Sequence, residues 1–168
     1  VASLAVLNIV GGYVTANRQR HAIQSLFGEY VPAAYVERMV ASPDSVNLSG
    51  EQRPMTVLFA DIRNFTALSE PLSAGELKDL LNRYLSSVTE VIFQHQGTID
   101  KYVGDMVMAF WNAPLDDEHH AAHAVRAALD MQACMARVRT EFEAAGLPVF
   151  RIGIGLNTGS MNVGDMGS

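Results

Sequence analysis

The spacing of hydrophobic positions predicts a series of helices and strands downstream of Gly50. Between 74 and 95, apolar side chains recur three or four residues apart, which gives an amphipathic helix a single core face. That face consists of Leu77, Leu80, Leu81, Tyr84, Leu85, Val88 and Val91. The other predicted elements are a strand 55–60, a short helix after Asn64, hairpin strands 98–103 and 106–111, a helix 117–145 and a strand 149–157.

This βαββαβ order predicts an α+β domain of the ferredoxin-like type, in which helices pack on a mainly antiparallel sheet. With 49% hydrophobic and 18% charged residues, the chain is typical of a globular protein. We expect Trp111, the pair Met106 and Met108, and the single cysteine, Cys134, in the core. Residues 69–70 are expected at a solvated helix end.

The first sixteen residues are apolar and uncharged, and Arg18 and Arg20 follow directly. A complete membrane span needs about 20 such residues. We therefore expect 1–16 to be the end of a transmembrane helix, with the arginines on its cytoplasmic flank. A buried or partner-facing helix is the alternative. Residues 17–49 are expected to form a helical connector and linker, which places the folded domain at 50–168 in the cytoplasm.

Two aspartates stand at the ends of predicted strands. Asp61 ends the strand 55–60, and Asp105 lies at the tip of the hairpin. Each one alone fits ordinary turn chemistry, as a helix cap or as a Gly-Asp turn. If the strand and the hairpin are neighbours, however, the two carboxylates meet and repel unless a proton or a cation lies between them.

Hard divalent ions such as Mg²⁺ are commonly held by one or two carboxylates together with substrate phosphates. The free amides of the helix that follows Asp61 suit an anion at the same place. Carboxylates, a divalent ion and free amides together indicate a site for a nucleoside triphosphate. The net charge of −6 argues against a nucleic-acid partner.

Two segments carry a resemblance to a known family. "FADIRNFTALSE" and "GTIDKYVGDMVMAFWNAP" resemble the catalytic domain of class III nucleotidyl cyclases, especially bacterial membrane-anchored adenylate cyclases. "RIGIGLNTGSMNVGDMGS" and "FGEYVP" resemble the following glycine-rich segment and the preceding connector. The resemblance covers residues 27–168 and stops short of the whole domain at its C-terminal side.

The resemblance implies a role for each matching residue. Asp61 and Asp105 would hold two Mg²⁺ or Mn²⁺ ions, with the carbonyl of Ile62 as a further ligand. The triphosphate would lie on the amides around Asn64, Phe65 and Thr66, and Gly104 would supply the tight turn before Asp105. One ion would lower the pKa of the ribose 3′-hydroxyl, and both would stabilise charge at the α-phosphate.

The resemblance also gives Lys101 a role in base recognition. It would reach adenine N1, whereas an ordinary strand lysine would be solvated. A lysine only donates hydrogen bonds, so it complements the acceptor N1 of adenine and opposes the N1–H of guanine. We therefore expect ATP to be favoured over GTP.

The expected function is an adenylate cyclase that converts ATP to 3′,5′-cyclic AMP and pyrophosphate in signal transduction, as a homodimer with its site at the interface. Because the family's transition-state asparagine and arginine would follow Ser168, we expect the 168 residues alone to be inactive. The alternatives are a guanylate cyclase, a diguanylate cyclase, and an inactive nucleotide-binding or dimerisation module.

A second pair of residues has metal-binding spacing. His119 and His123 lie four residues apart in the predicted helix 117–145. Two histidines at this spacing can clamp a zinc ion, but a zinc site needs further ligands and none lies within reach by sequence. We therefore do not expect a zinc site here.

Overall fold

The computed structural model describes residues 51–163. The expected end of a transmembrane helix, 1–16, and the expected connector, 17–49, lie outside the described residues. Within residues 51–163, no helix is long and apolar enough to cross a membrane.

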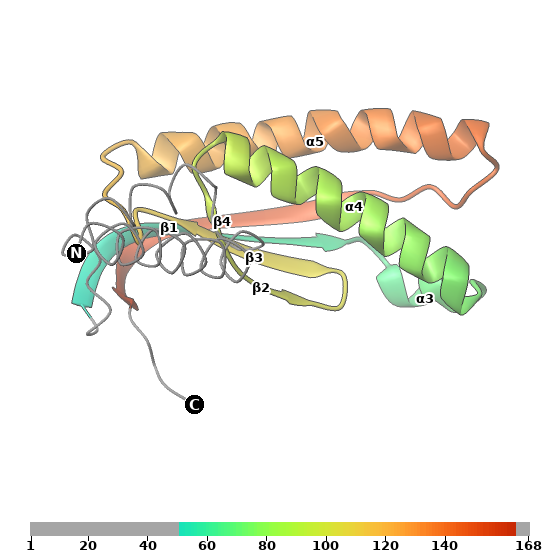
Figure 1. Ribbon diagram of the computed structural model, residues 1–168, viewed down its shortest axis with the longest axis horizontal. Helices are drawn as coiled ribbons and strands as arrows, with labels where there is room; N and C mark the ends of the chain where they lie inside the picture. Colours follow the sequence, from blue (N-terminus) through green and yellow to red (C-terminus); the bar gives the residue numbers. More distant parts are fainter. Residues whose placement is uncertain (1–50, 164–168) are drawn as a thin grey trace, which may run out of the picture. The chain divides into compact units, whose positions relative to one another are not determined.

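The domain is a four-stranded antiparallel sheet with two long helices on one face (Figure 1). The strands lie in the order β2-β3-β1-β4. They are β1 (Glu51–Ile62), β2 (Thr98–Val103), β3 (Met106–Trp111) and β4 (Ile152–Val163). The helices are the short α3 (Phe65–Ser69) and the long α4 (Ala74–Gln94) and α5 (His120–Ala144). The predicted α+β class and antiparallel sheet are confirmed.

Three predicted elements have clearly different bounds in the structure, among them the last strand, which was predicted at 149–157 and is observed as β4 from Ile152 to Val163. Strand β1 is twelve residues long instead of six, because its polar first half pairs with the end of β4, from Glu51 opposite Val163 onward. Helix α5 begins at His120, three residues later than predicted. The residues before it form a turn, in which Oδ1 of the buried Asp117 accepts the His119 amide at 2.9 Å.

The core lies between the sheet and the helices α4 and α5. Of the predicted stripe on α4, Leu80, Tyr84, Val88 and Val91 are buried, whereas its other three leucines are half-buried at the margin. Trp111 is fully buried, as predicted, and its indole N–H donates to the carbonyl of His95 at 2.8 Å. Cys134 is half-buried and packs against the edge of the core.

The prediction that Met106 and Met108 belong to the core is wrong. Side chains alternate along a strand, and the buried positions of β3 are Val107, Ala109 and Trp111. The two methionines are half-buried on the opposite face of the sheet, which we call the outer face. The strand period predicts only that alternate residues of β3 lie on opposite faces of the sheet. The packing of the helices decides which face belongs to the core.

Candidate functional site

The structure brings Asp105 to the end of the strand that carries Asp61. The Oδ2 atom of Asp105 accepts a hydrogen bond from the backbone amide of Ile62 at 2.8 Å. Strand β1 pairs with β3, with Ala60 opposite Val107, so the hairpin tip and the end of β1 lie at the same end of the sheet. Asp61 itself is exposed, and its neighbours Ala60 and Ile62 are buried on the helix side.

A tight turn presents Asp105 to this place. Residues 104–105 connect β2 to β3, and Gly104 has a φ of +62°, a left-handed conformation that favours glycine. No atom lies within 4 Å of the position that a Cβ on Gly104 would take. Backbone conformation, and not packing space, therefore explains the glycine.

The residues expected around the triphosphate lie on the next turn of the chain. Asn64 precedes α3 in a left-handed conformation, with φ 58° and ψ 35°, and its side chain does not cap the helix. Phe65 and Thr66 are the first residues of α3. The first amides of a helix have no intrahelical acceptor. These amides stand directly after the end of β1.

Lys101 lies on the outer face of β2. A bulge between Ile99 and Lys101 shifts the register, so that Lys101 pairs with Met108 while Ile99 pairs with Ala109 on the core side. The Lys101 side chain is exposed, and its Nζ lies 3.2 Å from Oδ2 of the neighbouring Asp100. Lys101 and Asp61 therefore project from the same face of the sheet, on different strands.

A group of arginines lies beside Asn64, and no pattern in the sequence predicts it. Arg63, Arg139 and Arg151 line a hollow of about 750 Å³, together with Asn64 and one acidic residue, Glu143. The Arg63 amide donates to the Arg151 carbonyl at 2.8 Å. Among residues 51–163, none of the three arginines forms an ion pair. Unpaired guanidinium groups grouped in this way favour an anionic ligand.

The position of Arg63 explains why residue 153 of β4 is a glycine. The Arg63 guanidinium occupies the space that a Cβ on Gly153 would need. Gly153 is the cross-strand partner of Asp61. A positive group therefore lies close to the end of β1 that carries the exposed carboxylate. Only the pairing of β1 with β4 reveals this, because Arg63 and Gly153 are far apart in the sequence.

Helix α4 carries a buried tyrosine hydroxyl, that of Tyr84, on the core side of the sheet. Burial, together with the negative charges of Asp105 and Asp61, raises the pKa of Tyr84. The hydroxyl is therefore protonated at neutral pH. Its oxygen has no hydrogen-bond partner among the described residues.

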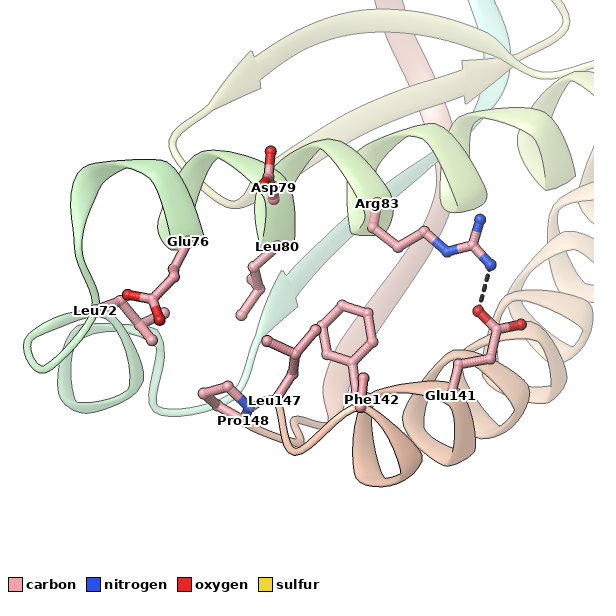
Figure 2. A pocket seen from close by; sticks show the side chains of 10 residues that line it. Leu72, Glu76, Asp79, Leu80, Arg83, Glu141, Phe142, Leu147 and Pro148 are labelled. Atoms are coloured by element: carbon pink, nitrogen blue, oxygen red, sulfur yellow. Dashed lines mark hydrogen bonds and ion pairs between the residues drawn. The ribbon is translucent and has the colours of Figure 1, made fainter.

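A hollow between α4 and α5 and the pair His119 and His123 both lie apart from the residues that were predicted to bind phosphate or metal. A mainly apolar hollow of about 340 Å³ lies between α4 and the end of α5, and the Arg83–Glu141 ion pair spans it (Figure 2). His123 binds Asp117 through Nδ1 at 2.8 Å instead of sharing a ligand with His119. Within residues 51–163 there is no cluster of three or more histidine, cysteine or acidic side chains that could hold a metal.

Comparisons with known proteins find relatives of the described domain. Residues 47–168 match the family described as the adenylate and guanylate cyclase catalytic domain. Adenylate cyclase 1 of Rhizobium meliloti is 36% identical over all 168 residues, and the adenylate cyclase of Anabaena cylindrica is 31% identical over 162 residues, 92% of this chain. The chain spans only 24% and 31% of the lengths of these two relatives.

Solved structures show the same similarity. The adenylyl cyclase CyaB from P. aeruginosa is 40% identical with a TM-score of 0.69, over 72% of this chain and 63% of that one. The guanylyl cyclase Cya2 is 38% identical with a TM-score of 0.68, over 71% of this chain and 60% of that one. The sequence match and the shared fold together establish that the chain belongs to the adenylate and guanylate cyclase catalytic domain family.

Proposed function

We propose that the protein is an adenylate cyclase that converts ATP to 3′,5′-cyclic AMP and pyrophosphate. The observation that carries this proposal is the hydrogen bond from Ile62 to Asp105, which holds the two predicted metal-binding aspartates at one end of the sheet. The relatives described as adenylate cyclases support the same activity.

The residues at this end of the sheet fit Mg²⁺ or Mn²⁺. Asp61 is exposed, and its carboxylate makes no hydrogen bond or ion pair with any described residue. The Asp105 carboxylate accepts a hydrogen bond through one oxygen only. Two carboxylates with free oxygens, and no complete protein cage, are the donor set expected where substrate phosphates complete the coordination. Asp61, Asp105 and the Ile62 carbonyl would hold two ions, which when bound offset the triphosphate charge and acidify the ribose 3′-hydroxyl.

The protein's own groups would position the nucleotide. The amides of Phe65 and Thr66 would donate to the β- and γ-phosphates, and Arg63 and Arg151 would add positive charge beside them. Lys101 would donate to adenine N1. Its contact with Asp100 is exposed, so exchanging that contact for the base costs little.

We also propose that the active form is a homodimer that joins two outer faces. Phe59 and Val103 on this face are 45% and 55% exposed. Contiguous exposed apolar patches mark interaction surfaces, and we take these two side chains as part of such a patch. Membrane attachment through residues 1–16, with the catalytic domain in the cytoplasm, is a further part of the proposal, and the uncharged apolar run before Arg18 supports it.

Product analysis tests the proposal. The complete natural protein would be incubated with ATP or GTP and with Mg²⁺ or Mn²⁺, and the cyclic nucleotides would be separated by chromatography. Cyclic AMP is expected from ATP, with loss of activity after chelation and in Asp61→Asn. Cyclic GMP as the main product would favour the second candidate, a guanylate cyclase, which the similarity to Cya2 also supports. No cyclic nucleotide from either substrate would contradict the proposal.

A further inference from the structure

The guanidinium of Arg63 lies in the place of a missing side chain. Its Nη2, Cζ and Nε atoms lie 2.0, 2.1 and 2.2 Å from the position that a Cβ on Gly153 would take. Gly153 is the partner of Asp61 across β1 and β4, and directly paired residues project from the same face of a sheet. The Arg63 guanidinium therefore lies on the outer face of the sheet, against the backbone of Gly153 and beside Asp61.

Arg63 and Asp61 carry opposite charges but do not form an ion pair. The Cβ positions of directly paired residues lie about 4.5–5.5 Å apart, which makes the guanidinium a near neighbour of the Asp61 side chain. Both side chains are exposed, and among residues 51–163 neither one forms an ion pair. The two groups are therefore open to a ligand that offers a cation to the carboxylate and an anion to the guanidinium.

The backbone conformation of residue 153 does not explain its glycine. Among the described residues, the glycines with a positive φ are Gly104 and Gly146, so residue 153 does not need glycine to avoid strain. A glycine inside a strand weakens the strand, and it often marks a place where a ligand or another group comes close to the backbone. Here that group is the Arg63 guanidinium. A Cβ at residue 153 would displace it, and the long arginine side chain could move without disturbing the fold.

We propose that Arg63 binds the terminal phosphates of the nucleotide, and that Gly153 leaves the space that holds its guanidinium in place for this contact. A guanidinium can donate two parallel hydrogen bonds to one phosphate. Charges would then alternate across the outer face, from the Asp61 carboxylate to a divalent ion, the phosphate and the Arg63 guanidinium. In the chain, Arg63 lies between Asp61 and the first amides of α3, which are the groups proposed to hold the ion and the same phosphates. This inference rests on the proposed cyclase function and assigns its phosphate-binding arginine.

The test compares Arg63→Gln, Gly153→Ala and the double variant in the complete natural protein. Isothermal titration calorimetry would measure the affinity for pyrophosphate with Mg²⁺, and cyclic AMP formation would give kcat and KM for ATP. We expect Arg63→Gln to weaken pyrophosphate binding by about 10–100-fold, the scale of one hydrogen bond between charged groups. Because the contact exists before and after the reaction, KM should rise more than kcat falls. Gly153→Ala should change both quantities in the same direction, because it displaces the guanidinium.

The double variant shows whether Gly153 acts through Arg63. Two residues that serve one contact have non-additive effects, so Gly153→Ala should have no further effect in the Arg63→Gln background. Gly155→Ala is the matched control, because Gly155 lies two residues further along β4, on the same face, and has no atom within 4 Å of its Cβ position. Its pyrophosphate affinity should equal that of wild type. Thermal unfolding without nucleotide checks that each variant is folded.

The outcomes separate this inference from the proposed function. Unchanged pyrophosphate affinity in Arg63→Gln, in an active wild-type background, would overturn the role of Arg63 and leave the cyclase proposal intact. A lower unfolding temperature with unchanged affinity would overturn it as well, by showing a purely structural arginine. Equal effects of Gly153→Ala with and without Arg63 would overturn the role of Gly153. A wild-type protein that makes no cyclic nucleotide and does not bind pyrophosphate with Mg²⁺ would refute the proposed function itself.

Discussion

The amide of Ile62 donates to the carboxylate of Asp105 at 2.8 Å, across a sequence separation of 43 residues. This bond ties the end of β1 to the tip of the β2–β3 hairpin. It also means that Asp105 has two separable properties: an oxygen that accepts a backbone hydrogen bond, and a negative charge. Substitutions can remove them one at a time.

Replacing Asp105 by asparagine should abolish catalysis and preserve the fold. The asparagine Oδ1 can still accept the Ile62 amide, but the charge that offsets a divalent ion is lost. We expect turnover to fall by at least about 10²–10³-fold, the scale reported for losing one preorganised electrostatic contact. Cyclic AMP formation and thermal unfolding measure the two effects. Asp105→Ala, which removes both properties, should also lower the unfolding temperature; equal activity of Asp105→Asn and wild type would show a turn residue only.

Replacing Lys101 by glutamate should change base preference. A carboxylate accepts from the guanine N1–H and repels the adenine N1 lone pair. Leaving one such hydrogen-bonding group unpaired costs about 1–3 kcal/mol, so the ratio of kcat/KM values for ATP and GTP should change by about 10–100-fold. Lys78→Glu, on the exposed side of α4, is the charge-matched control. An unchanged ratio in Lys101→Glu would exclude the adenine contact.

Placing a charge on the outer face should weaken dimerisation. Phe59→Lys introduces an ammonium group at a side chain that is 45% exposed on β1. If this face forms the dimer, the dissociation constant should rise by at least about tenfold, as for loss of a buried aromatic contact. Leu129→Lys is the control, because Leu129 is 65% exposed on α5, on the other side of the sheet. Sedimentation equilibrium measures both variants, and equal effects would argue against the outer face.

Gly97→Ala should destabilise the domain. A Cβ at this position would lie 2.6 Å from Ile92 and 2.7 Å from the Trp111 ring, both of them fully buried. Overpacking of this kind costs about 1–3 kcal/mol in the free energy of unfolding. Gly75→Ala serves as the control, since a Cβ there has no atom within 4 Å, and it should stabilise α4 by up to about 1 kcal/mol. Urea unfolding measures whether each substitution lowers or raises the free energy of unfolding.

The capping box of α4 should make stability depend on pH. The Glu76 carboxylate accepts from the hydroxyl and the amide of Ser73 at 2.6 and 2.9 Å, and these bonds lower the pKa of Glu76. A lowered folded-state pKa contributes stability above the unfolded value of about 4.3, and that contribution is lost as the pH falls through the folded value. Glu76→Gln should therefore unfold at a lower temperature than wild type at pH 7, and the difference should shrink as the pH falls below about 4.3. A constant difference would contradict the assignment.

Several features of the protein follow from the sequence alone. The 3.6-residue spacing around Tyr84 and Val88 predicts α4, because only one helical face can be covered by the sheet. The Gly-Asp step at 104–105 predicts a tight turn, because glycine adopts a positive φ without strain. Local patterns of this kind are enough to predict the α+β class and the order of the helices and strands.

Tertiary structure decided the rest, because the determining contacts join distant residues. The alternation of side chains along β3 does not predict whether Met108 or Val107 faces the core. The packing of α4 and α5 against one face of the sheet determines it. No local pattern predicts that the Arg63 guanidinium occupies the space beside Gly153, or that the hydroxyl of Tyr84 is buried without a hydrogen-bond partner among the described residues. A sequence determines the period of each element and the chemistry at its ends, but pairing and packing determine which ends meet.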